Sequence, residues 1–273
     1  MKKFSDFSVL MPVYFSDDSE LFKKAIESVF SNTLIPKYLY IIVDGPLSSS
    51  LNNVINLAKN KYRQKLKVYR LKKNMGITKA LNYGLKKISE EIIVRADADD
   101  INSHQRFSIL ITEINKGFDI VGSNITEFIS QKKMFIRVVP TNKSDIKSLI
   151  RYRNPFNHMS VVFRRSKILM LGGYPELKFF EDYALWAKAI KYNLNLKNIN
   201  KSLVDVSVNK NFYKRRGGFS YLICIYRFQK YLLRLNLINK KIFFLNLISR
   251  FFVAIVFPSL RQFIYNIGLR SIK

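Results

Sequence analysis

Short runs of apolar residues alternate with amphipathic stretches between residues 7 and 94. A short, almost uniformly apolar run is typical of a buried strand, whereas apolar residues three and four positions apart are typical of a helix that packs on one face. Repeated strand–helix units with short connections predict a mostly parallel sheet with helices on both faces. The predicted strands are residues 7–14, 38–46, 66–71 and 91–97, and the predicted helices are residues 20–30, 51–62 and 77–88.

Polar residues gather at the point where each of these strands ends. In open sheets of this kind, ligands bind beyond the carboxyl ends of the strands. We therefore expect the binding site at this edge of the sheet. The polar stretches are residues 14–18, 44–45, 74–76 and 97–100.

The middle of the chain predicts a second group of elements. Two strands flank a polar turn at residues 130–133, and later strands and helices follow at wider spacing. The predicted strands are residues 119–129 and 134–140, a strand after the loop in NPFNHMSVVFRRS, and residues 203–208; the predicted helices are residues 144–152 and 181–192.

The C-terminal part differs in charge. After Asp205 the chain has no acidic residue, while thirteen Lys and Arg remain. Apolar residues recur at helical spacing with basic residues opposite, which predicts a basic amphipathic helix. The apolar positions are Tyr221, Ile225, Phe228 and Leu232, and the basic positions are Arg227, Lys230 and Arg234.

A more apolar stretch follows at residues 242–260, with Arg250 near its centre. Nineteen residues barely span a bilayer. An arginine at mid-depth costs about 2.5–3.5 kcal/mol even on the lenient insertion scale. We therefore favour a pair of helices that lie in the plane of a membrane surface over a spanning helix.

Composition narrows the possible partners. At 273 residues, the chain is long enough for a sizeable core, and the formal net charge of +28 indicates a polyanionic neighbour, which is nucleic acid, an anionic membrane or a phosphorylated substrate. A single cysteine excludes an internal disulfide, and two histidines do not suffice for a zinc-type cluster. A reducing cytoplasm is consistent with this composition, and the first twenty residues do not resemble a signal peptide.

The stretch VRADADD, residues 94–100, places three carboxylates at the end of a predicted strand. Asp100 and Asn102 could cap a helix that begins near His104. Alternatively, the Asp97-Ala98-Asp99 pattern suits Mg²⁺ or Mn²⁺, since carboxylates this close repel one another unless a cation lies between them. Both interpretations stay open for the triplet alone.

Two neighbouring features favour an anionic ligand. Arg95 lies two residues before Asp97 and carries a charge suited to phosphate. The segment NMGITKALN, residues 74–82, places Gly76 at a helix start with Lys79 one turn inside, and a helix N-terminus is a natural anion site. A simple turn at Gly76 is the alternative.

Five segments, in this order and spacing, resemble a family-two glycosyltransferase with the GT-A nucleotide-sugar fold. The resemblance covers about residues 7–208, and residues 211–218 further resemble the bacterial amylovoran and O-antigen glycosyltransferases. It predicts a glycosyltransferase domain at residues 1–210 and a basic helical, membrane-associating segment at residues 211–273. The five segments are SVLMPVY, IIVDGP, NMGITKALNYG, VRADADD and FFEDYALWAKA.

The resemblance implies a UDP-sugar donor and a Mn²⁺ or Mg²⁺ ion. Asp44 would hydrogen-bond the uracil, Asp97 would hold the ribose or a water of the metal site, and Asp99 would ligate the metal with Asp100 nearby. The ion would neutralise the charge on the departing UDP. The remaining residues implied for the nucleoside and its surroundings are Pro12, Val13, Tyr14, Asn74, Gly76 and Lys79.

Glu181 and Asp182 form a second carboxylate pair at the start of a predicted helix. Such a pair is often a helix cap. By resemblance, Asp182 would deprotonate the acceptor hydroxyl and Glu181 would position it, so that the anomeric centre is inverted. Trp186 on the same helix is interpreted as a core residue rather than a sugar platform.

The chain departs from many relatives in one respect. They carry a histidine after the last strand that completes the metal site, and here the segment reads VSVNKNFYKRRGG. We expect Arg215 and Arg216 to neutralise the diphosphate instead, because guanidinium groups bind phosphate in a bidentate manner. His158 is either a structural residue or a metal or acceptor ligand.

The sequence therefore predicts a peripheral enzyme on the cytoplasmic face of the inner membrane. It would move a hexose or N-acetylhexosamine onto a polyprenyl-diphosphate-linked saccharide in O-antigen, capsule or exopolysaccharide assembly, at an anionic surface that attracts the basic tail. We infer no nucleic-acid partner and no obligate protein partner. The alternatives are a basic nucleic-acid-binding protein and a sugar-phosphate nucleotidyltransferase. The identity of the sugar depends on the pocket near residues 154–159 and 174–180.

Overall fold

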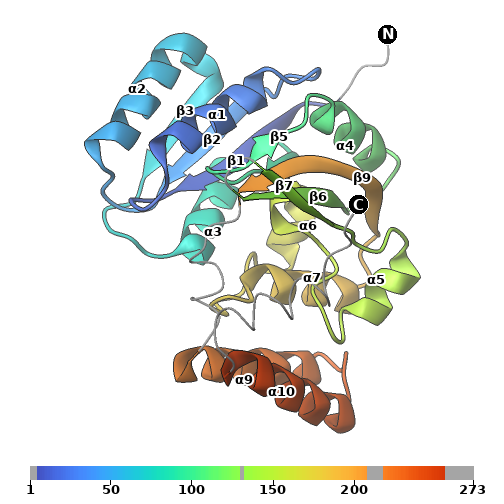
Figure 1. Cartoon of the computed structure of the whole chain (residues 1–273). Coiled ribbons are helices and arrows are strands. Elements are labelled where there is room, and N and C mark those ends of the chain that lie inside the picture. The colour runs from blue at the N-terminus through green and yellow to red at the C-terminus, as the bar shows by residue number, and fades with distance from the viewer. Residues whose placement is uncertain (1–4, 130–131, 208–217, 256–273) are drawn as a thin grey trace.

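The structure is a computed structural model that describes residues 5–129, 132–207 and 218–255. A central sheet carries helices on both faces, and a hairpin of two helices forms a further layer at one end (Figure 1). In chain order, the strands and α-helices are β1 (Phe7–Val13), α1 (Ser19–Phe30), β2 (Tyr38–Val43), α2 (Ser49–Tyr62), β3 (Leu66–Arg70), α3 (Ile77–Lys87), β4 (Ile92–Arg95), β5 (Ile101–Asn102), α4 (Arg106–Ile114), β6 (Ile120–Ile129), β7 (Lys132–Arg137), α5 (Lys143–Leu149), β8 (Val162–Arg164), α6 (Arg165–Met170), α7 (Glu181–Lys191), β9 (Leu196–Ser207), α9 (Phe219–Arg234) and α10 (Lys240–Ile255).

The strands form one mixed sheet in the order β3-β2-β1-β4-β8-β6-β9-β5, with β7 paired to β6. The first four strands are parallel, as the alternating pattern predicted. Beyond β4 the prediction of a mostly parallel sheet does not hold, because β8 is antiparallel to both β4 and β6, and β5 and β7 are also antiparallel to their partners. β6 and β9 form the remaining parallel pair.

Two hydrophobic clusters cover the two faces of the sheet. One packs α1, α2 and α4 against β1 to β4. The other packs α3, α5, α6 and α7 on the opposite face, and it continues into α9 and α10. This face of the sheet, its helices and the C-terminal helices therefore share one contiguous core among the described residues.

The helix-capping interpretation of the acidic triplet is wrong. α4 begins at Arg106, the side chain of its N-cap residue Gln105 makes no capping bond, and Asn32 Oδ1 accepts from the backbone N–H of Phe107 in the first turn at 3.1 Å. Asn102 instead lies on β5, where its backbone and side-chain N–H groups both donate to Ser28 Oγ, at 3.0 and 2.7 Å. Asp100 and Asn102 therefore do not cap α4.

The amphipathic pattern in α9 is confirmed, but protein rather than lipid covers its apolar face. Tyr221, Ile225, Phe228 and Leu232 are buried. The ring of Phe228 lies 4.6 Å from that of Phe180, just before α7. The face that the sequence marks as apolar is therefore occupied by the domain itself.

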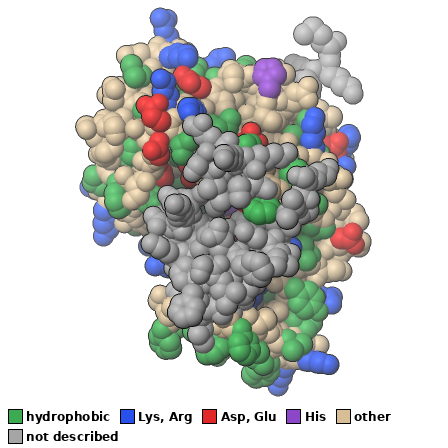
Figure 2. Space-filling model, in the orientation of Figure 1, with side chains coloured by type: hydrophobic (Ala, Val, Ile, Leu, Met, Phe, Trp, Pro, Cys, Tyr) green, Lys and Arg blue, Asp and Glu red, His purple; other side chains and the backbone are tan. Residues whose placement is uncertain are grey.

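α10 also turns one side towards the domain. Asn246 donates to the backbone oxygen of Arg151 at 2.8 Å, and Arg250 donates to that of Tyr152 at 2.8 Å. The arginine that interrupts the apolar stretch thus points at the protein. Within residues 5–129, 132–207 and 218–255, no helix combines the length and apolar character needed to cross a bilayer. Figure 2 shows hydrophobic side chains at the end of the molecule that this hairpin forms.

The close approach of α3 to the sheet gives a stability prediction. A Cβ at Gly84 would lie 2.4 Å from Leu10 Cδ1 and 3.0 Å from Ile42 Cγ1. We expect Gly84→Val to lower the free energy of unfolding by about 2–3 kcal/mol, because the core has no space for the added side chain. Urea denaturation measures this change.

The matched control is Asn53→Val on the exposed side of α2. Asparagine and valine have similar helix propensities, so stability should stay within about 0.5 kcal/mol of wild type. A Gly84→Val protein as stable as wild type would contradict the packing of α3 on β1 and β2.

Candidate active site

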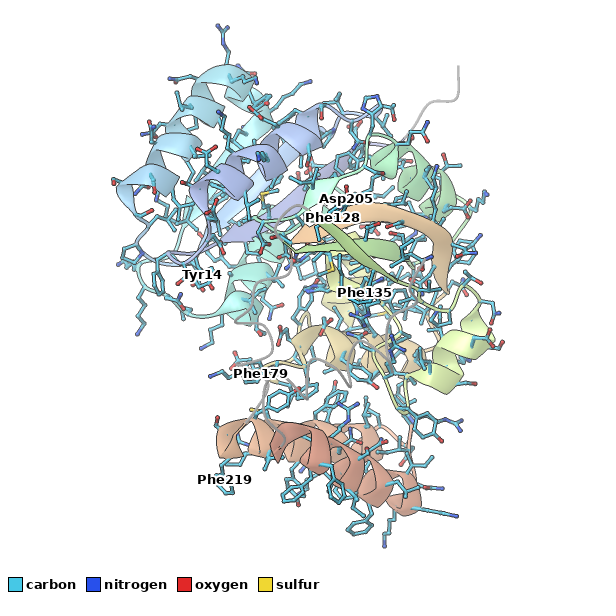
Figure 3. The ribbon with its side chains drawn as sticks, viewed as in Figure 1. Tyr14, Phe128, Phe135, Phe179, Asp205 and Phe219 are labelled. Atoms are coloured by element: carbon cyan, nitrogen blue, oxygen red, sulfur yellow. The ribbon has the colours of Figure 1, made fainter. Side chains whose placement is uncertain are left out.

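A cavity of about 860 Å³ opens at the carboxyl ends of β1, β2 and β4. This is the edge at which the polar strand ends predicted a site. In Figure 3, Tyr14 lies beside α3, and Phe179 lies between α3 and the α9–α10 hairpin. The lining residues are Pro12, Val13, Tyr14, Asp17, Asp44, Asn74, Met75, Gly76, Ile77, Thr78, Lys79, Ala80, Asp97, Ala98, Asp99, Glu176, Lys178, Phe179 and Glu181.

Asp44 builds one wall of the cavity. Its two carboxylate oxygens accept hydrogen bonds from the backbone N–H groups of Met75 and Gly76, at 2.7 and 2.8 Å. Gly76 has a φ of 88° and stands before the first residue of α3, a conformation that glycine adopts without strain. Asp44 thus holds the start of α3 in place, and each of its oxygens retains a lone pair for a ligand.

Gly45 permits this close approach. A Cβ there would lie 2.5 Å from the backbone nitrogen of Asn74. Any larger residue would push the two loops apart. The second and third strand ends therefore form one surface.

The three carboxylates after β4 converge. One oxygen from each of Asp97, Asp99 and Asp100 lies within 4.8 Å of the others. Asp97 and Asp99 line the cavity, whereas Asp100 is buried behind them. Burial and the charges of Asp99 and Asp97 raise the pKa of Asp100 well above its usual value.

Two buried arginines lie behind these carboxylates. Arg95, only 1% exposed, forms an ion pair with Asp97. Burial opposes its charge, but Asp97 outweighs that effect and raises the pKa of Arg95. Arg106 is fully buried, and burial lowers its pKa to about 9, so it stays charged at neutral pH.

Arg95 thus differs from its predicted role. It is not among the residues that line the cavity, because its side chain points into the core. Its charge acts on Asp97 instead of contacting a ligand phosphate directly.

The acidic cluster suits a hard divalent cation. Three carboxylates this close repel one another, and an ion such as Mg²⁺ or Mn²⁺ prefers oxygen ligands. Oδ2 of Asp100 is buried and has no hydrogen-bond partner among the described residues, so a cation would satisfy it. A bound cation would favour the charged forms of these carboxylates and offset their mutual repulsion.

His158 belongs to the core rather than to this cluster. Its Nε2 lies 3.0 Å from Tyr174 Oη, and its ring lies between those of Tyr174 and Trp186, with centroid distances of 5.4 and 6.1 Å. Burial, and secondarily the charge of Arg95, lower the pKa of His158 well below its usual value. A structural role follows, and the interpretation of Trp186 as a fully buried core residue is confirmed.

The second carboxylate pair begins α7. The N-cap residue of α7 is Phe180, whose side chain makes no capping bond, whereas Asp182 Oδ1 accepts from the backbone N–H of Tyr183 in the first turn, at 2.7 Å. Glu181 lines the cavity, on the same cavity surface as Asp97 and Asp99. Asp182 does not line it in the described part of the chain; its Oδ2 accepts a hydrogen bond from Asn154 Nδ2 at 2.7 Å.

Asn82 joins the two walls of the cavity. This residue of α3 donates to the backbone oxygen of Tyr174 at 2.9 Å and accepts from its N–H at 2.8 Å. The loop that leads to Glu181 is thereby fixed to the helix that carries Lys79. Residues that are 92 positions apart in the sequence form one rigid boundary.

Of the predicted site residues, ten line the cavity together: Pro12, Val13, Tyr14, Asp44, Asn74, Gly76, Lys79, Asp97, Asp99 and Glu181. Arg215 and Arg216 lie outside the described residues.

Sequence reasoning missed several residues of the site. Asp17, Glu176, Lys178 and Phe179 line the cavity but were not named as site residues, although Asp17 lies in the polar stretch 14–18 that was expected at this edge. Phe179 has a φ of 70°, a strained conformation that no sequence pattern marked in advance. The expectation that residues 174–180 shape the pocket was the available signal.

Comparison with known proteins finds relatives over nearly the whole chain. The profile described as Glycosyl transferase family 2 matches residues 8–170. An Escherichia coli UDP-Gal:alpha-D-GlcNAc-diphosphoundecaprenol beta-1,3-galactosyltransferase is 37% identical over 97% of this chain and 96% of that protein. The amylovoran biosynthesis glycosyltransferase AmsE of Erwinia amylovora is 30% identical over 95% of this chain and 98% of that protein.

Solved structures share the fold at low identity. S. aureus TarS 1-349 in complex with UDP-GlcNAc superimposes with a TM-score of 0.68 at 18% identity, over 97% of this chain and 76% of that one. Mannosyltransferase PcManGT from Pyrobaculum calidifontis, in complex with GDP-Man and Mn2+, superimposes with a TM-score of 0.65 at 12% identity, over 99% of this chain and 77% of that one. The chain spans only 43% of a longer TarS structure, with a TM-score of 0.59 at 20% identity over 83% of this chain. The GT-A architecture predicted from the sequence is confirmed.

The environment of His158 predicts a pH effect on stability. Its pKa is lowered in the folded state, so the unfolded chain binds a proton that the folded chain does not. The contribution of neutral His158 to the free energy of unfolding is complete above about pH 6.5. It is lost as the pH falls below that value, at up to about 1.4 kcal/mol per pH unit. We expect the free energy of unfolding of His158→Gln to fall less between pH 7.5 and 5.5 than that of wild type, measured by urea denaturation.

His104→Gln is the control, because His104 is exposed. That variant should keep the pH dependence of wild type. Equal slopes for His158→Gln and wild type would contradict a buried, neutral histidine.

Proposed function

The chain belongs to glycosyl transferase family 2, and we propose that it transfers a hexose or N-acetylhexosamine from a UDP-sugar to a lipid-diphosphate-linked saccharide. The resemblance seen in the sequence is thereby confirmed at the level of the family. One observation carries the proposal: Asp97, Asp99 and Glu181, from distant parts of the sequence, line one cavity of about 860 Å³. That volume suits a sugar nucleotide.

The substrates are inferred from the relatives. The E. coli relative is named for UDP-Gal and for GlcNAc-diphosphoundecaprenol, and AmsE for amylovoran biosynthesis. UDP-galactose is an α-glycoside, so a β-linked product in that relative means inversion at the anomeric carbon. We extend inversion and a lipid-diphosphate acceptor to this chain.

The donor would lie against the wall formed by β1, β2 and α3. Pro12, Val13 and Tyr14 would contact the nucleoside, and Asp44 would use its remaining lone pairs for the base. The start of α3 adds Asn74, Gly76 and Lys79 to the base and ribose surroundings, where a helix N-terminus favours anions.

Asp99 would hold Mn²⁺ or Mg²⁺, with Asp97 and Asp100 beside it. The bound ion would stabilise the negative charge of the diphosphate leaving group. The buried arginines keep the carboxylates close enough together for this role. From their place in the sequence, Arg215 and Arg216 would add charge at the diphosphate.

Asp182 would act as the general base on the acceptor hydroxyl, and Glu181 would position that acceptor at the cavity wall. Asn154 is a positioning residue in this scheme. Its Oδ1 accepts from the backbone N–H of Phe156 at 3.2 Å, which orients the amide so that its Nδ2 faces Asp182.

The acceptor determines where the enzyme would work. A polyprenyl-diphosphate-linked sugar lies at the membrane surface, so we propose a peripheral location at the cytoplasmic face of the inner membrane. The excess of basic residues favours an anionic surface.

A direct test is transfer from UDP-sugars to a synthetic GlcNAc-diphospho-lipid, with and without Mn²⁺. UDP-galactose is the first donor to examine. Release of UDP with a disaccharide-lipid product supports the proposal, whereas release of inorganic diphosphate would indicate nucleotidyl transfer. Binding to oligonucleotides without any transfer would favour the nucleic-acid-binding alternative.

The acidic cluster gives a prediction for the donor side. We expect Asp99→Asn to lower kcat by about 10²–10³-fold or more, because the diphosphate charge loses its stabilisation. The variant should also need a higher Mn²⁺ concentration for half-maximal activity. Glu20→Gln, an exposed substitution on α1, should leave both values unchanged. Full activity of Asp99→Asn would refute its assigned role.

Asn154 gives a prediction for the acceptor side. We expect Asn154→Ala to lower kcat by about 10- to 100-fold while KM for the donor stays constant. A hydrogen bond donated to a carboxylate favours its charged form, so its loss should move the acidic limb of the kcat–pH profile to higher pH.

A purely structural role for Asn154 would lower thermal stability without moving the pH limb. Asp182→Asn should abolish the limb together with the activity. An unchanged pH profile in Asn154→Ala would remove Asn154 from the mechanism.

A further inference from the structure

The α9–α10 hairpin has one side towards the domain and one towards solvent. On the inner side, the ring of Phe228 lies 4.6 Å from Phe180 and 4.4 Å from Tyr183. Asn246 and Arg250 of α10 donate to the backbone oxygens of Arg151 and Tyr152 in the segment after α5. These contacts occupy the inner side, so any further partner must bind the outer one.

The outer side of α10 carries a continuous apolar stripe. The exposed residues recur at three- and four-residue spacing, which places them on one helical face. The exposed fractions are 60% for Phe244, 53% for Leu245, 55% for Ile248, 49% for Phe251 and 65% for Phe252.

α9 extends this surface. Phe219, 79% exposed, points away from the domain in Figure 3, and Tyr226 reaches α10 with its ring 6.0 Å from that of Phe243. Figure 2 shows the resulting hydrophobic patch at this end of the molecule. Apolar patches of this extent mark interaction surfaces. We name it the outer hairpin face, and it consists of Phe219, Tyr226, Phe244, Leu245, Ile248, Phe251 and Phe252.

Charge identifies the occupant. Residues 219–255 contain six basic residues and no acidic one. The sequence after residue 255 adds three basic residues and again no acidic one. Two copies of such a surface would repel each other, whereas anionic lipid attracts each exposed Lys or Arg near it by about 1 kcal/mol. The exposed basic residues beside the outer hairpin face are Arg227, Lys230, Arg234, Lys240 and Lys241.

We infer that the outer hairpin face docks on an anionic phospholipid bilayer, with its aromatic and aliphatic side chains in the headgroup region. This inference deepens the proposed function and rests on it for the lipid-linked acceptor. Phe180 is stacked on Phe228 and directly precedes Glu181, so the docked hairpin would hold the start of α7 at a fixed height above the lipid. The acceptor sugar, attached to its lipid by a diphosphate, would then meet Asp182 without leaving the membrane.

The test uses the full chain and vesicles of phosphatidylglycerol and phosphatidylcholine. Wild type should co-sediment with anionic vesicles, less so in 0.5 M salt, and poorly with phosphatidylcholine alone. The double variant Phe244→Gln/Phe252→Gln should bind anionic vesicles at least tenfold more weakly, because two of the most exposed rings are lost.

Leu57→Gln/Met170→Gln is the matched control. These residues are 56% and 60% exposed on α2 and α6, away from the hairpin. This pair should bind vesicles like wild type, and thermal unfolding should show that both double variants are folded.

Activity separates this inference from the proposed function. On a short-chain, water-soluble acceptor, Phe244→Gln/Phe252→Gln should match wild type, while transfer to the lipid-linked acceptor in vesicles should fall. No transfer by wild type to either acceptor would refute the proposed function, and vesicle binding would still test the docking face.

Two results would overturn the docking inference. One is equal vesicle binding by Phe244→Gln/Phe252→Gln and wild type. The other is a wild-type dimer in light scattering that becomes a monomer in this double variant, which would assign the face to a second copy of the chain.

Discussion

Charge compensation between three clustered carboxylates and two buried guanidinium groups is the constraint on which the site depends. Arg106 donates to the backbone oxygens of Arg95 and Met159, at 2.6 and 2.7 Å, and to the side chain of Asn102. One side chain thus links the end of β4, the end of β5 and the segment before β8. Breaking a buried network of this kind costs several kcal/mol, since the remaining charge is left in the core. The carboxylates are therefore positioned by the fold itself, in an arrangement that suits a divalent cation.

The sequence predicted the first half of the molecule well because local pattern and tertiary structure agree there. β1, β2 and β4 are short, mostly apolar runs, and polar residues that line the cavity follow the strand ends. The orientation of Arg95 was not predictable in this way. Side chains alternate along a strand, and the sequence does not show which face of β4 is enclosed by the pairing with β8. The structure shows that Arg95 is buried there and forms an ion pair with Asp97.

The second half was harder to predict for a different reason. β8 has three residues and β5 has two, too few for a periodic signal, and both pair antiparallel with strands distant in sequence. In α9 and α10, periodicity revealed an apolar face but not its partner. The domain covers the apolar face of α9 that contains Phe228. The apolar face of α10 that contains Phe244 is exposed, which only the structure shows. An apolar stripe read from one helix cannot distinguish a core contact from a membrane contact.

The two halves of the chain contribute different parts of the candidate site. Segments up to Asp100 form the wall beside β1, β2 and α3 and the acidic cluster, while Asn154, Glu181 and Asp182 come from the second half. Asn82 bonds both backbone groups of Tyr174, so the second wall is fixed to the first by main-chain contacts that do not depend on loop side chains. Glu176, Lys178 and Phe179 lie in the loop after this anchor. Substitutions there would change this part of the cavity while β1, β2, α3 and the carboxylates keep their geometry, and such changes in pocket shape let one fold accept different substrates.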